Sequence, residues 1–355
     1  MDKGKKLIDM HKLIYDLPEQ IKIAYEISTK NKIHIKKTDI KNIVVAGMGG
    51  SGIGGNIIKG LAFGNSRIPI IPVKDYTLPG FVSKDTLFFA VSYSGNTEET
   101  LACFNSAKKI GCKIIAITSN GKLREECLKH NFDFIEIPAG LPSRVAVGYL
   151  FIPLLVILSK IGIIPKVDAS IKETLTLLFR NRNKYDKHLK SFARGLRNSV
   201  PIIYTNSAMF EPVAMRWQAQ FNENAKIICH FNVFPELNHN EIVGICDNNP
   251  VGFYYYLLLT DNKAHERNLL RTELTLEIIR KNRCHEKHYR YQKFYPDGKS
   301  DLARMFSLIM QGDLLSYHLA RVRGIEPGLI LPIDELKHLM KTCKLANSKI
   351  VRLKK

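Results

Sequence analysis

The chain has 355 residues, of which 45% are hydrophobic and 24% are charged. This composition is ordinary for a globular protein, and the length exceeds what one hydrophobic core usually supports, so we expect two domains. The formal net charge of +20 would suit nucleic-acid binding, but no RNA- or DNA-binding signature accompanies it. We therefore expect no nucleic-acid partner and interpret the charge as a solvated surface or a positive field that attracts phosphorylated small molecules.

The first half of the chain alternates apolar runs with amphipathic segments. Apolar residues at helical spacing in the first 30 residues predict helices, with a break or a fresh start at Pro18. Strands are then predicted at 42–46, 68–73, 86–91, 113–118 and 133–137. Helices are predicted near 53–63, 97–110, 122–130 and 144–160. Such alternation indicates a parallel sheet with helices on both faces.

A second alternation follows a long polar helix. We expect that helix at 168–195, strands at 201–205, 225–229, 251–259 and 284–291, and helices at 209–222, 266–281 and 300–322. The predicted fold class is therefore α/β, with two doubly wound parallel-sheet domains. The predicted boundaries are a first domain at 1–167, a linker helix at 168–195 and a second domain at 196–355 with a basic C-terminal tail.

A glycine-rich loop follows the first predicted strand, in the order Gly47-Met48-Gly49-Gly50-Ser51-Gly52-Ile53-Gly54-Gly55. Glycine permits positive φ and close approach of a ligand, and amides at a helix start favour an anion. The nucleotide P-loop pattern is absent. The dinucleotide pattern matches formally, with Asp75 available as the ribose acid, but Ser51 within the loop suits a terminal phosphate better.

A second loop, Ser92-Tyr93-Ser94-Gly95-Asn96-Thr97, follows another predicted strand. Ser92, Ser94 and Thr97 offer three hydroxyls where a helix begins, and hydroxyls with backbone amides can satisfy phosphate oxygens. The alternative is that Ser94 or Asn96 caps the helix. Capping needs one such residue, so three hydroxyls beside a glycine favour a phosphate ligand.

The remaining chemistry-bearing residues exclude several classes of site. The seven cysteines are widely spaced and form no Cys-x-x-Cys, which is typical of reduced thiols in the cytoplasm. Cys284, His285 and His288 lie close together without a second ligand group, so we expect no metal and no other cofactor. The N-terminus lacks the apolar segment of a secretory signal. The apolar stretch 145–164 is interrupted by glycine, proline and polar residues, which indicates a core helix and no membrane span.

Four motifs together resemble known sugar-phosphate enzymes. The two loops, at 47–55 and 92–100, resemble those of a sugar isomerase (SIS) domain. The segments Arg216-Trp217-Gln218-Ala219-Gln220-Phe221-Asn222-Glu223-Asn224-Ala225-Lys226 and Pro235-Glu236-Leu237-Asn238-His239-Asn240-Glu241-Ile242-Val243-Gly244 are similar to the bifunctional phosphoglucose/phosphomannose isomerases. The resemblance extends over residues 5–345, and the last two motifs are specific to that family.

The resemblance implies an aldose–ketose isomerase of two SIS-type domains, acting as a homodimer with its active site at the subunit interface. It implies that Glu223 transfers the proton, that His239 opens the sugar ring and that Lys337 approaches the substrate, so these three are the expected catalytic residues. Arg144 would steady the enediolate oxygen by its charge. The expected substrate-binding residues are Gly50, Ser51, Ser92, Ser94, Thr97, Arg144, His239 and Lys337.

Several interpretations stay open at this stage. Glu223 alone is equally a surface glutamate at a helix end, Glu241 could orient the His239 imidazole, and His318 is interpreted as a core residue. Gly328 stands where family members often have threonine, a residue associated with acceptance of mannose 6-phosphate. The protein could instead isomerise an amino-sugar or pentose phosphate, or sense a sugar phosphate without turnover.

Overall fold

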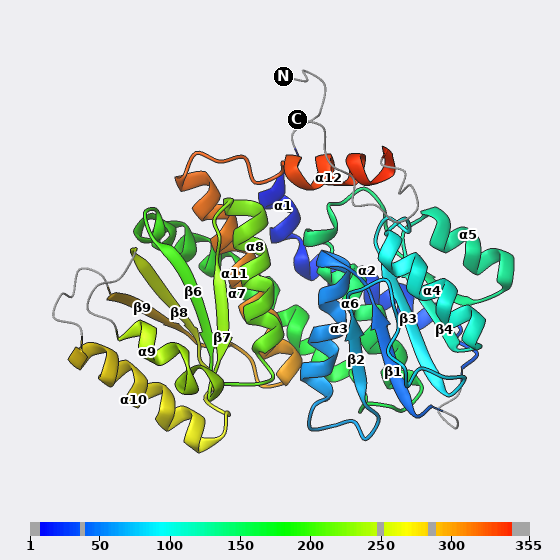
Figure 1. The fold of residues 1–355 in the computed structure, drawn as a ribbon, viewed down its shortest axis with the longest axis horizontal. Helices are drawn as coiled ribbons and strands as arrows, with labels where there is room; N and C mark the ends of the chain where they lie inside the picture. The colour runs from blue at the N-terminus through cyan, green and yellow to red at the C-terminus, as the bar shows by residue number, and fades with distance from the viewer. Residues whose placement is uncertain (1–7, 36–39, 247–251, 283–288, 343–355) are drawn as a thin grey trace, which may run out of the picture.

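The computed structural model describes residues 8–35, 40–246, 252–282 and 289–342. Each half of the chain is built around an all-parallel sheet (Figure 1). Sheet A has the strand order β2-β1-β3-β4-β5 and sheet B the order β7-β6-β8-β9. The predicted α/β class with two doubly wound parallel-sheet domains is confirmed.

Sheet A is buried on both faces, as its nearly continuous apolar strands require. Its strands are β1 (Asn42–Ala46), β2 (Ile70–Val73), β3 (Thr86–Ser92), β4 (Lys113–Thr118) and β5 (Asp133–Glu136). One face packs against α2 (Leu17–Lys30), α3 (Gly49–Ala62) and α6 (Val147–Lys160), and the other against α4 (Glu98–Ile110) and α5 (Gly121–His130). A short 3-10 helix, η1 (Ser143–Val145), precedes α6.

Sheet B is also covered on both faces. Its strands are β6 (Val200–Thr205), β7 (His230–Val233), β8 (Tyr254–Leu259) and β9 (Tyr289–Phe294). The inner face packs on α7 (Asp168–Phe192), α8 (Glu211–Ala225) and α11 (Asp301–Val322). The outer face carries η3 (Glu236–His239), α9 (Glu241–Ile245) and α10 (Glu266–Asn282). The remaining elements are α1 (Met10–Tyr15), η2 (Ala193–Leu196) and α12 (Leu331–Thr342).

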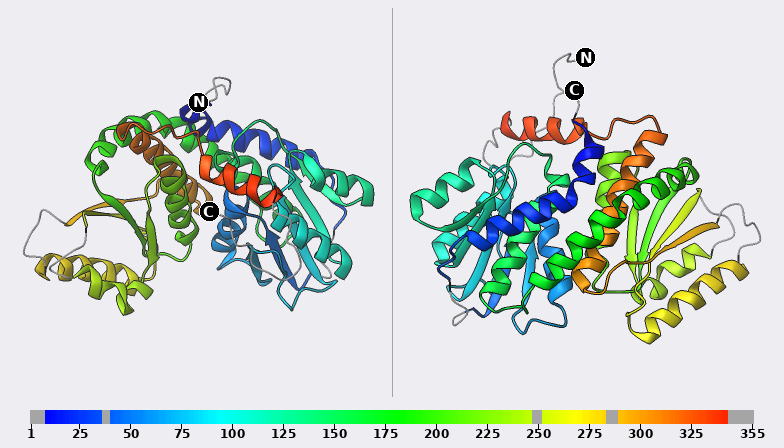
Figure 2. Two further views of the ribbon diagram at one scale, coloured as in Figure 1. Left: turned by 45° about the horizontal axis from the view of Figure 1, so that its top comes forward. Right: turned by 180° about the vertical axis from the view of Figure 1, so that it is seen from behind.

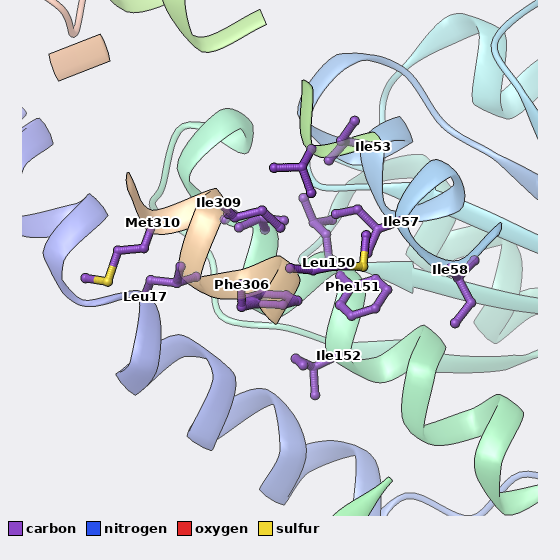
Figure 3. Close-up of a cluster of buried hydrophobic side chains, with 14 of the residues drawn as sticks. Leu17, Ile53, Ile57, Ile58, Leu150, Phe151, Ile152, Phe306, Ile309 and Met310 are labelled. Carbon is purple, nitrogen blue, oxygen red and sulfur yellow. The ribbon is translucent and has the colours of Figure 1, made fainter. Parts of the chain in front are cut away.

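One hydrophobic core runs from the inner face of sheet A to the inner face of sheet B. Figure 3 shows its centre, where side chains of α2, α3 and α6 meet those of α11. Phe151 of α6 and Phe306 of α11 contact each other there, with ring centroids 5.5 Å apart and ring planes tilted by 38°. The inner faces of the two sheets and the helices between them therefore belong to one hydrophobic core.

The carboxyl ends of the two sheets lie at opposite ends of the molecule. The last turn of α3, at Gly60, lies against Met209 and Pro212 at the start of α8. The start of α3, at Gly50, lies against Arg144, which contacts Asn224 near the end of α8. The two helices are thus antiparallel. Because each helix begins beside the carboxyl end of its preceding strand, the two sheets point in opposite directions.

The predicted elements are mostly correct, with three differences. Helix α3 begins at Gly49, inside the glycine run, because most of these glycines serve close backbone approach within a helical turn. The strand predicted at 225–229 is wrong: α8 continues to Ala225, Lys226 adopts a left-handed conformation (φ 51°), and β7 spans His230–Val233. Of the strand predicted at 284–291, residues 284–288 lie outside the described residues and β9 begins at 289.

The longest apolar stretch becomes a core helix, as predicted. Helix α6 has 14 residues, and all from Val147 to Leu158 are buried. Among the described residues, none of the helices combines the length and apolar character needed to cross a membrane.

Candidate active site

The two predicted phosphate loops lie side by side at the carboxyl end of sheet A. They follow β1 and β3, which are neighbours in the sheet. Ser51, in the first turn of α3, accepts a hydrogen bond at Oγ from the backbone N–H of Tyr93, with 3.0 Å between the two atoms. Gly49 is the one residue of this first loop with positive φ (49°). The amides of Ser51 and Gly52 donate to the carbonyl oxygen of Met48, and those of Gly49 and Gly50 precede these bonds at the helix start, where amides can bind an anion.

The hydroxyls of the second loop do not cap α4. Ser92 and Thr97 pair through their side-chain oxygens at 2.9 Å, and Thr97 makes no capping hydrogen bond although it precedes the helix. Ser94 is exposed and accepts a bond from the N–H of Asn96 at 3.3 Å. Asn96 bonds to the backbone of Ser94 and Lys122. Capping therefore does not explain these side chains, and the amides at the start of α4 add to those of α3.

Gly50 connects the phosphate loop to Arg144. A Cβ at Gly50 would lie 2.6 Å from the carbonyl carbon and oxygen of Ser143 and 2.7 Å from the backbone nitrogen of Arg144. Any side chain at this position would collide with that backbone. The close approach holds η1, and with it Arg144, beside the amides at the start of α3.

Arg144 is almost fully buried and joins three segments that are far apart in the sequence. Its Nε donates to Oδ1 of Asn224 at 3.0 Å, and its Nη2 donates to the carbonyl oxygens of Pro327 and Gly328 at 2.7 and 3.1 Å. Sδ of Met10 lies 3.9 Å from the same Nη2. These contacts fix the guanidinium, and its remaining nitrogen, Nη1, is directed toward α8.

Glu223 lies on the side of Arg144 that these contacts leave free. One carboxylate oxygen of Glu223 is 4.0 Å from Nη1 of Arg144, and the glutamate side chain is 23% exposed. Burial lowers the pKa of Arg144, and the negative charges of Glu223 and Asp334 oppose that shift. A half-buried carboxylate beside a fixed positive charge, near an anion site, can exchange protons with a bound carbon acid whose charge develops near the arginine.

A buried ion pair between Arg216 and Asp313 helps to hold Arg144 in place. Arg216 of α8 donates through Nη2 to the backbone oxygen of Arg144 at 2.8 Å and to Asp313 of α11 at 2.6 Å. Asn224 also donates to Oγ of Ser316 on α11 at 2.9 Å. Arg216 belongs to the family motif at 216–226. Its bond to the backbone of Arg144 was not predicted, because the two residues are 72 positions apart and no local pattern indicates such a contact.

Lys337 lies on α12, which crosses the top of the molecule in Figure 1 and in the right-hand view of Figure 2. Its side chain is exposed. Asp334 of the same helix is close enough to act on the Arg144 charge. Since residues three apart share one face of a helix, Lys337 is on the face of α12 that carries Asp334.

His239 does not meet Glu223 within one chain. It is exposed at the end of η3, after β7 and therefore at the carboxyl end of sheet B. Glu223 is at the opposite end of α8, a helix about 22 Å long. Figure 1 shows this separation: α9, which directly follows this histidine, is at the lower left and α12 is at the top. The Glu241 carboxylate accepts bonds from Tyr204 and Asn232 and lies 3.4 Å from Nε2 of His230, so orientation of His239 by Glu241 stays a prediction.

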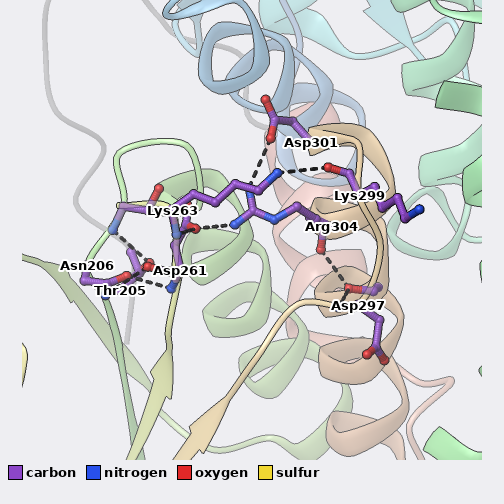
Figure 4. Close-up of polar contacts among 10 residues, drawn as sticks. Thr205, Asn206, Asp261, Lys263, Asp297, Lys299, Asp301 and Arg304 are labelled. Carbon is purple, nitrogen blue, oxygen red and sulfur yellow. Dashed lines mark hydrogen bonds and ion pairs between the residues drawn. The ribbon is translucent and has the colours of Figure 1, made fainter. Parts of the chain in front are cut away.

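Sheet B holds an internal ion pair where sheet A holds its loops. Arg304 of α11 pairs with Asp261, which follows β8, and with Asp301 at 3.1 Å (Figure 4). Asn206, after β6, accepts a bond from the N–H of Asp261 at 2.8 Å. At this end of sheet B the charge of Arg304 is therefore paired with carboxylates of the protein itself. The Cys284, His285 and His288 group lies outside the described residues.

Solved structures share this architecture. The chain superimposes on the C-terminal domain of glucosamine-fructose-6-phosphate aminotransferase from Francisella tularensis with a TM-score of 0.70, covering 91% of this chain and 98% of that one at 19% identity. The SIS domain family model matches residues 38–137, and the bacterial phospho-glucose isomerase C-terminal SIS domain model matches residues 186–340. The fold is therefore that of a two-domain SIS protein.

Sequence relatives define the family more narrowly. The chain is 43% identical to the bifunctional phosphoglucose/phosphomannose isomerase of Caldicellulosiruptor bescii, over 94% of this chain and 100% of that protein. It is 40% identical to the protein of the same name from Thermoplasma acidophilum, over 83% of this chain and 88% of that one. The chain belongs to the bifunctional phosphoglucose/phosphomannose isomerase family.

Proposed function

We propose that the protein is an aldose–ketose isomerase that interconverts glucose 6-phosphate with fructose 6-phosphate, and mannose 6-phosphate with fructose 6-phosphate. The observation that carries the proposal is the pair formed by Glu223 and Arg144, 4.0 Å apart and next to the loops at the carboxyl end of sheet A. The names of the relatives support the choice of substrates. Because the relatives are named as enzymes that act on sugar phosphates, we infer that the protein acts in the cytoplasm.

The phosphate of the sugar binds at the two loops. Backbone amides at the starts of α3 and α4 and the hydroxyls of Ser94 and Thr97 supply donors around one anion. Ser51 and Ser92 are buried and already bonded within the loops, so they shape the site and the exposed Ser94 contacts the phosphate first. Gly50 keeps this site next to Arg144, which places the sugar chain toward Glu223.

Glu223 is the base that moves the proton. In the open-chain aldose it removes the proton from C2 and returns it to C1, while the O2 hydroxyl proton passes to O1, so no atom is gained or lost. Negative charge develops on the oxygen of the enediolate, and Nη1 of Arg144 lies where it can stabilise that charge. Lys337, on the exposed α12, approaches the substrate from the side of Arg144 on which Asp334 lies.

His239 serves the active site of a second copy of the chain. It lies at the far end of α8 from Glu223, so a ring-opening role requires a homodimer in which each site combines Glu223 of one subunit with the His239 of the other. Histidine suits this role because imidazole is a common general acid and base in catalysis.

The test is the substitution Glu223→Gln with each of the three sugar phosphates as substrate. The amide cannot accept the proton, so kcat should fall at least about 10²-fold while substrate binding persists. Glu211→Gln, at the other end of the same helix, is the matched control and should retain activity. Near-wild-type turnover by Glu223→Gln would contradict the assignment. Binding without turnover in the unmodified protein would instead favour a sugar-phosphate sensor.

The shared site has a test of its own. Glu223→Gln and His239→Ala subunits should each be inactive alone. After mixing and subunit exchange, half of the dimers are mixed and each has one complete site, so about a quarter of the wild-type activity should return. No recovery, despite proven mixed dimers, would show that both residues act within one subunit, whereas activity of either variant alone would show that the replaced residue is not needed.

A further inference from the structure

A second cluster of ionisable side chains lies where α1, α7 and α11 meet, away from the site described above. His11 comes from α1, Asp186 from α7 and His318 from α11. The Nε2 atoms of both imidazoles lie 2.7 Å from the same atom, Oδ1 of Asp186. The three ligand atoms lie within 4.8 Å of one another, and the described part of the chain has no other such group of three.

The cluster is partly shielded from solvent. The His318 side chain is 7% exposed and the Asp186 side chain is 22% exposed. A metal ion would bind the ionised carboxylate and the unprotonated Nε2 of each imidazole.

We propose that His11, Asp186 and His318 form a binding site for a divalent transition-metal ion of the zinc class. Two imidazole nitrogens and one carboxylate oxygen are a donor set that suits zinc, whereas calcium and magnesium prefer oxygen ligands. Each ring would carry its proton on Nδ1 while Nε2 binds the ion. The site goes beyond the isomerase reaction and does not depend on it.

The geometry needs only a small adjustment to admit the ion. Ligand atoms around a tetrahedral zinc with bonds of about 2.0 Å are about 3.3 Å apart, so each nitrogen–oxygen distance must open by about 0.6 Å from its 2.7 Å. His11 is the most exposed member, at 34%, and can make that movement. Its exposure also leaves room for water as a fourth ligand.

The ion would join the N-terminal helix to the two long helices of the second half. Helix α1 has six residues, and its Met10 lies against Arg144. A helix this short has little stability of its own. Metal binding would therefore hold the segment that covers one side of Arg144.

The experiment titrates the full chain, freed of metal by a chelator, with zinc by calorimetry and with cobalt by visible absorption. We expect one ion per chain and a cobalt spectrum of tetrahedral type. Asp186→Asn and His11→Ala should each weaken zinc binding at least about 100-fold, since even outer-shell partners are worth 10 to 100-fold. His188→Ala, an exposed histidine on the same helix as Asp186, is the matched control and should bind zinc normally.

Thermal unfolding gives a second readout. Zinc should raise the Tm of the unmodified chain and of the His188→Ala control, but not that of the two ligand variants, because only a native-state site is stabilised by its ligand. His11 is partly exposed, so His11→Ala keeps the test open if Asp186→Asn fails to fold.

Two outcomes would overturn the proposal. If the unmodified chain binds no stoichiometric zinc, the cluster is a hydrogen-bonded group only. If all variants bind zinc equally, the ion is held elsewhere, and a cobalt spectrum with thiolate bands would direct attention to the cysteines.

Discussion

Gly50→Ala tests whether the phosphate loop positions Arg144. The new Cβ would lie 2.6 Å from the carbonyl of Ser143, whereas ordinary van der Waals contacts begin at 3.4 Å, so the two backbones must separate by about 3.4 − 2.6 = 0.8 Å. Misplacement of catalytic groups by about 1 Å can cost about 10²-fold. We therefore expect kcat/KM to fall by about 10²-fold, together with a loss of about 1–3 kcal/mol in unfolding free energy from overpacking.

The control for this prediction lies in the same helix. At Gly54 a Cβ would meet its nearest neighbours at 3.8 Å, so Gly54→Ala introduces the same methyl group without a collision. Its higher helix propensity should stabilise the protein by about 0.5–1 kcal/mol. The two variants are compared in a coupled assay with glucose 6-phosphate and by urea unfolding. If Gly50→Ala matches Gly54→Ala within about twofold in kcat/KM, the close approach does not position the catalytic arginine.

Four further predictions address phosphate binding, sugar choice, stability and metal. Replacing Ser94 and Thr97 together by alanine should raise KM about 10-fold or more with little change in kcat, since ground and transition states lose the same phosphate bonds; an unchanged KM would argue against the site. Gly328→Thr should raise the ratio of mannose to glucose 6-phosphate turnover about 10-fold, the worth of one hydrogen bond to the sugar. The new Cβ would meet only the Glu326 side chain closely, at 3.2 Å. If the variant and the unmodified protein have the same turnover ratio, residue 328 does not control acceptance of mannose 6-phosphate. Asp313→Asn leaves a buried arginine without its counter-charge and should lower the unfolding free energy by about 3–5 kcal/mol in urea melts; a change below about 1 kcal/mol would mean that the pair is not tightly coupled. Dialysis against a strong chelator should leave the isomerase rate unchanged for all three sugars, because the base and the positive charge are side chains, and a loss that zinc restores even in His11→Ala, which lacks the proposed zinc site, would contradict the mechanism.

Local sequence patterns were sufficient for sheet A because its strands are buried on both faces. Continuous apolar runs such as Leu87–Val91 are distinctive, and the loops that follow them carry their glycines and hydroxyls in the sequence itself. The edge strand β7 was missed since its sequence, His-Phe-Asn-Val, is half polar. The apolar neighbours that suggested a strand at 225–229 include Ile228, which is 88% exposed.

The environment of the site could not be predicted from local patterns. Arg144 draws its partners from positions 80 and 183 residues away, and none of them has a local signature. Glu223 lies near the end of α8 and His239 follows β7, so the two lie at opposite ends of sheet B, and the antiparallel packing of α3 and α8 brings Glu223 to the phosphate loops. The family resemblance indicated which residues belong to the expected active site. The structure shows which of them lie close together within one chain: Glu223 lies near Arg144, and His239 lies apart from both.

The continuous core that joins the two sheets has a consequence for how the protein comes apart. Phe151 belongs to the first half and Phe306 to the second, yet each completes the packing of the other. Separating the halves would expose this apolar surface on both to water, so each half would be less stable without the other. Although it is long enough for two independent domains, the chain should behave in denaturation as a single cooperative unit, and damage in either half is felt throughout the molecule.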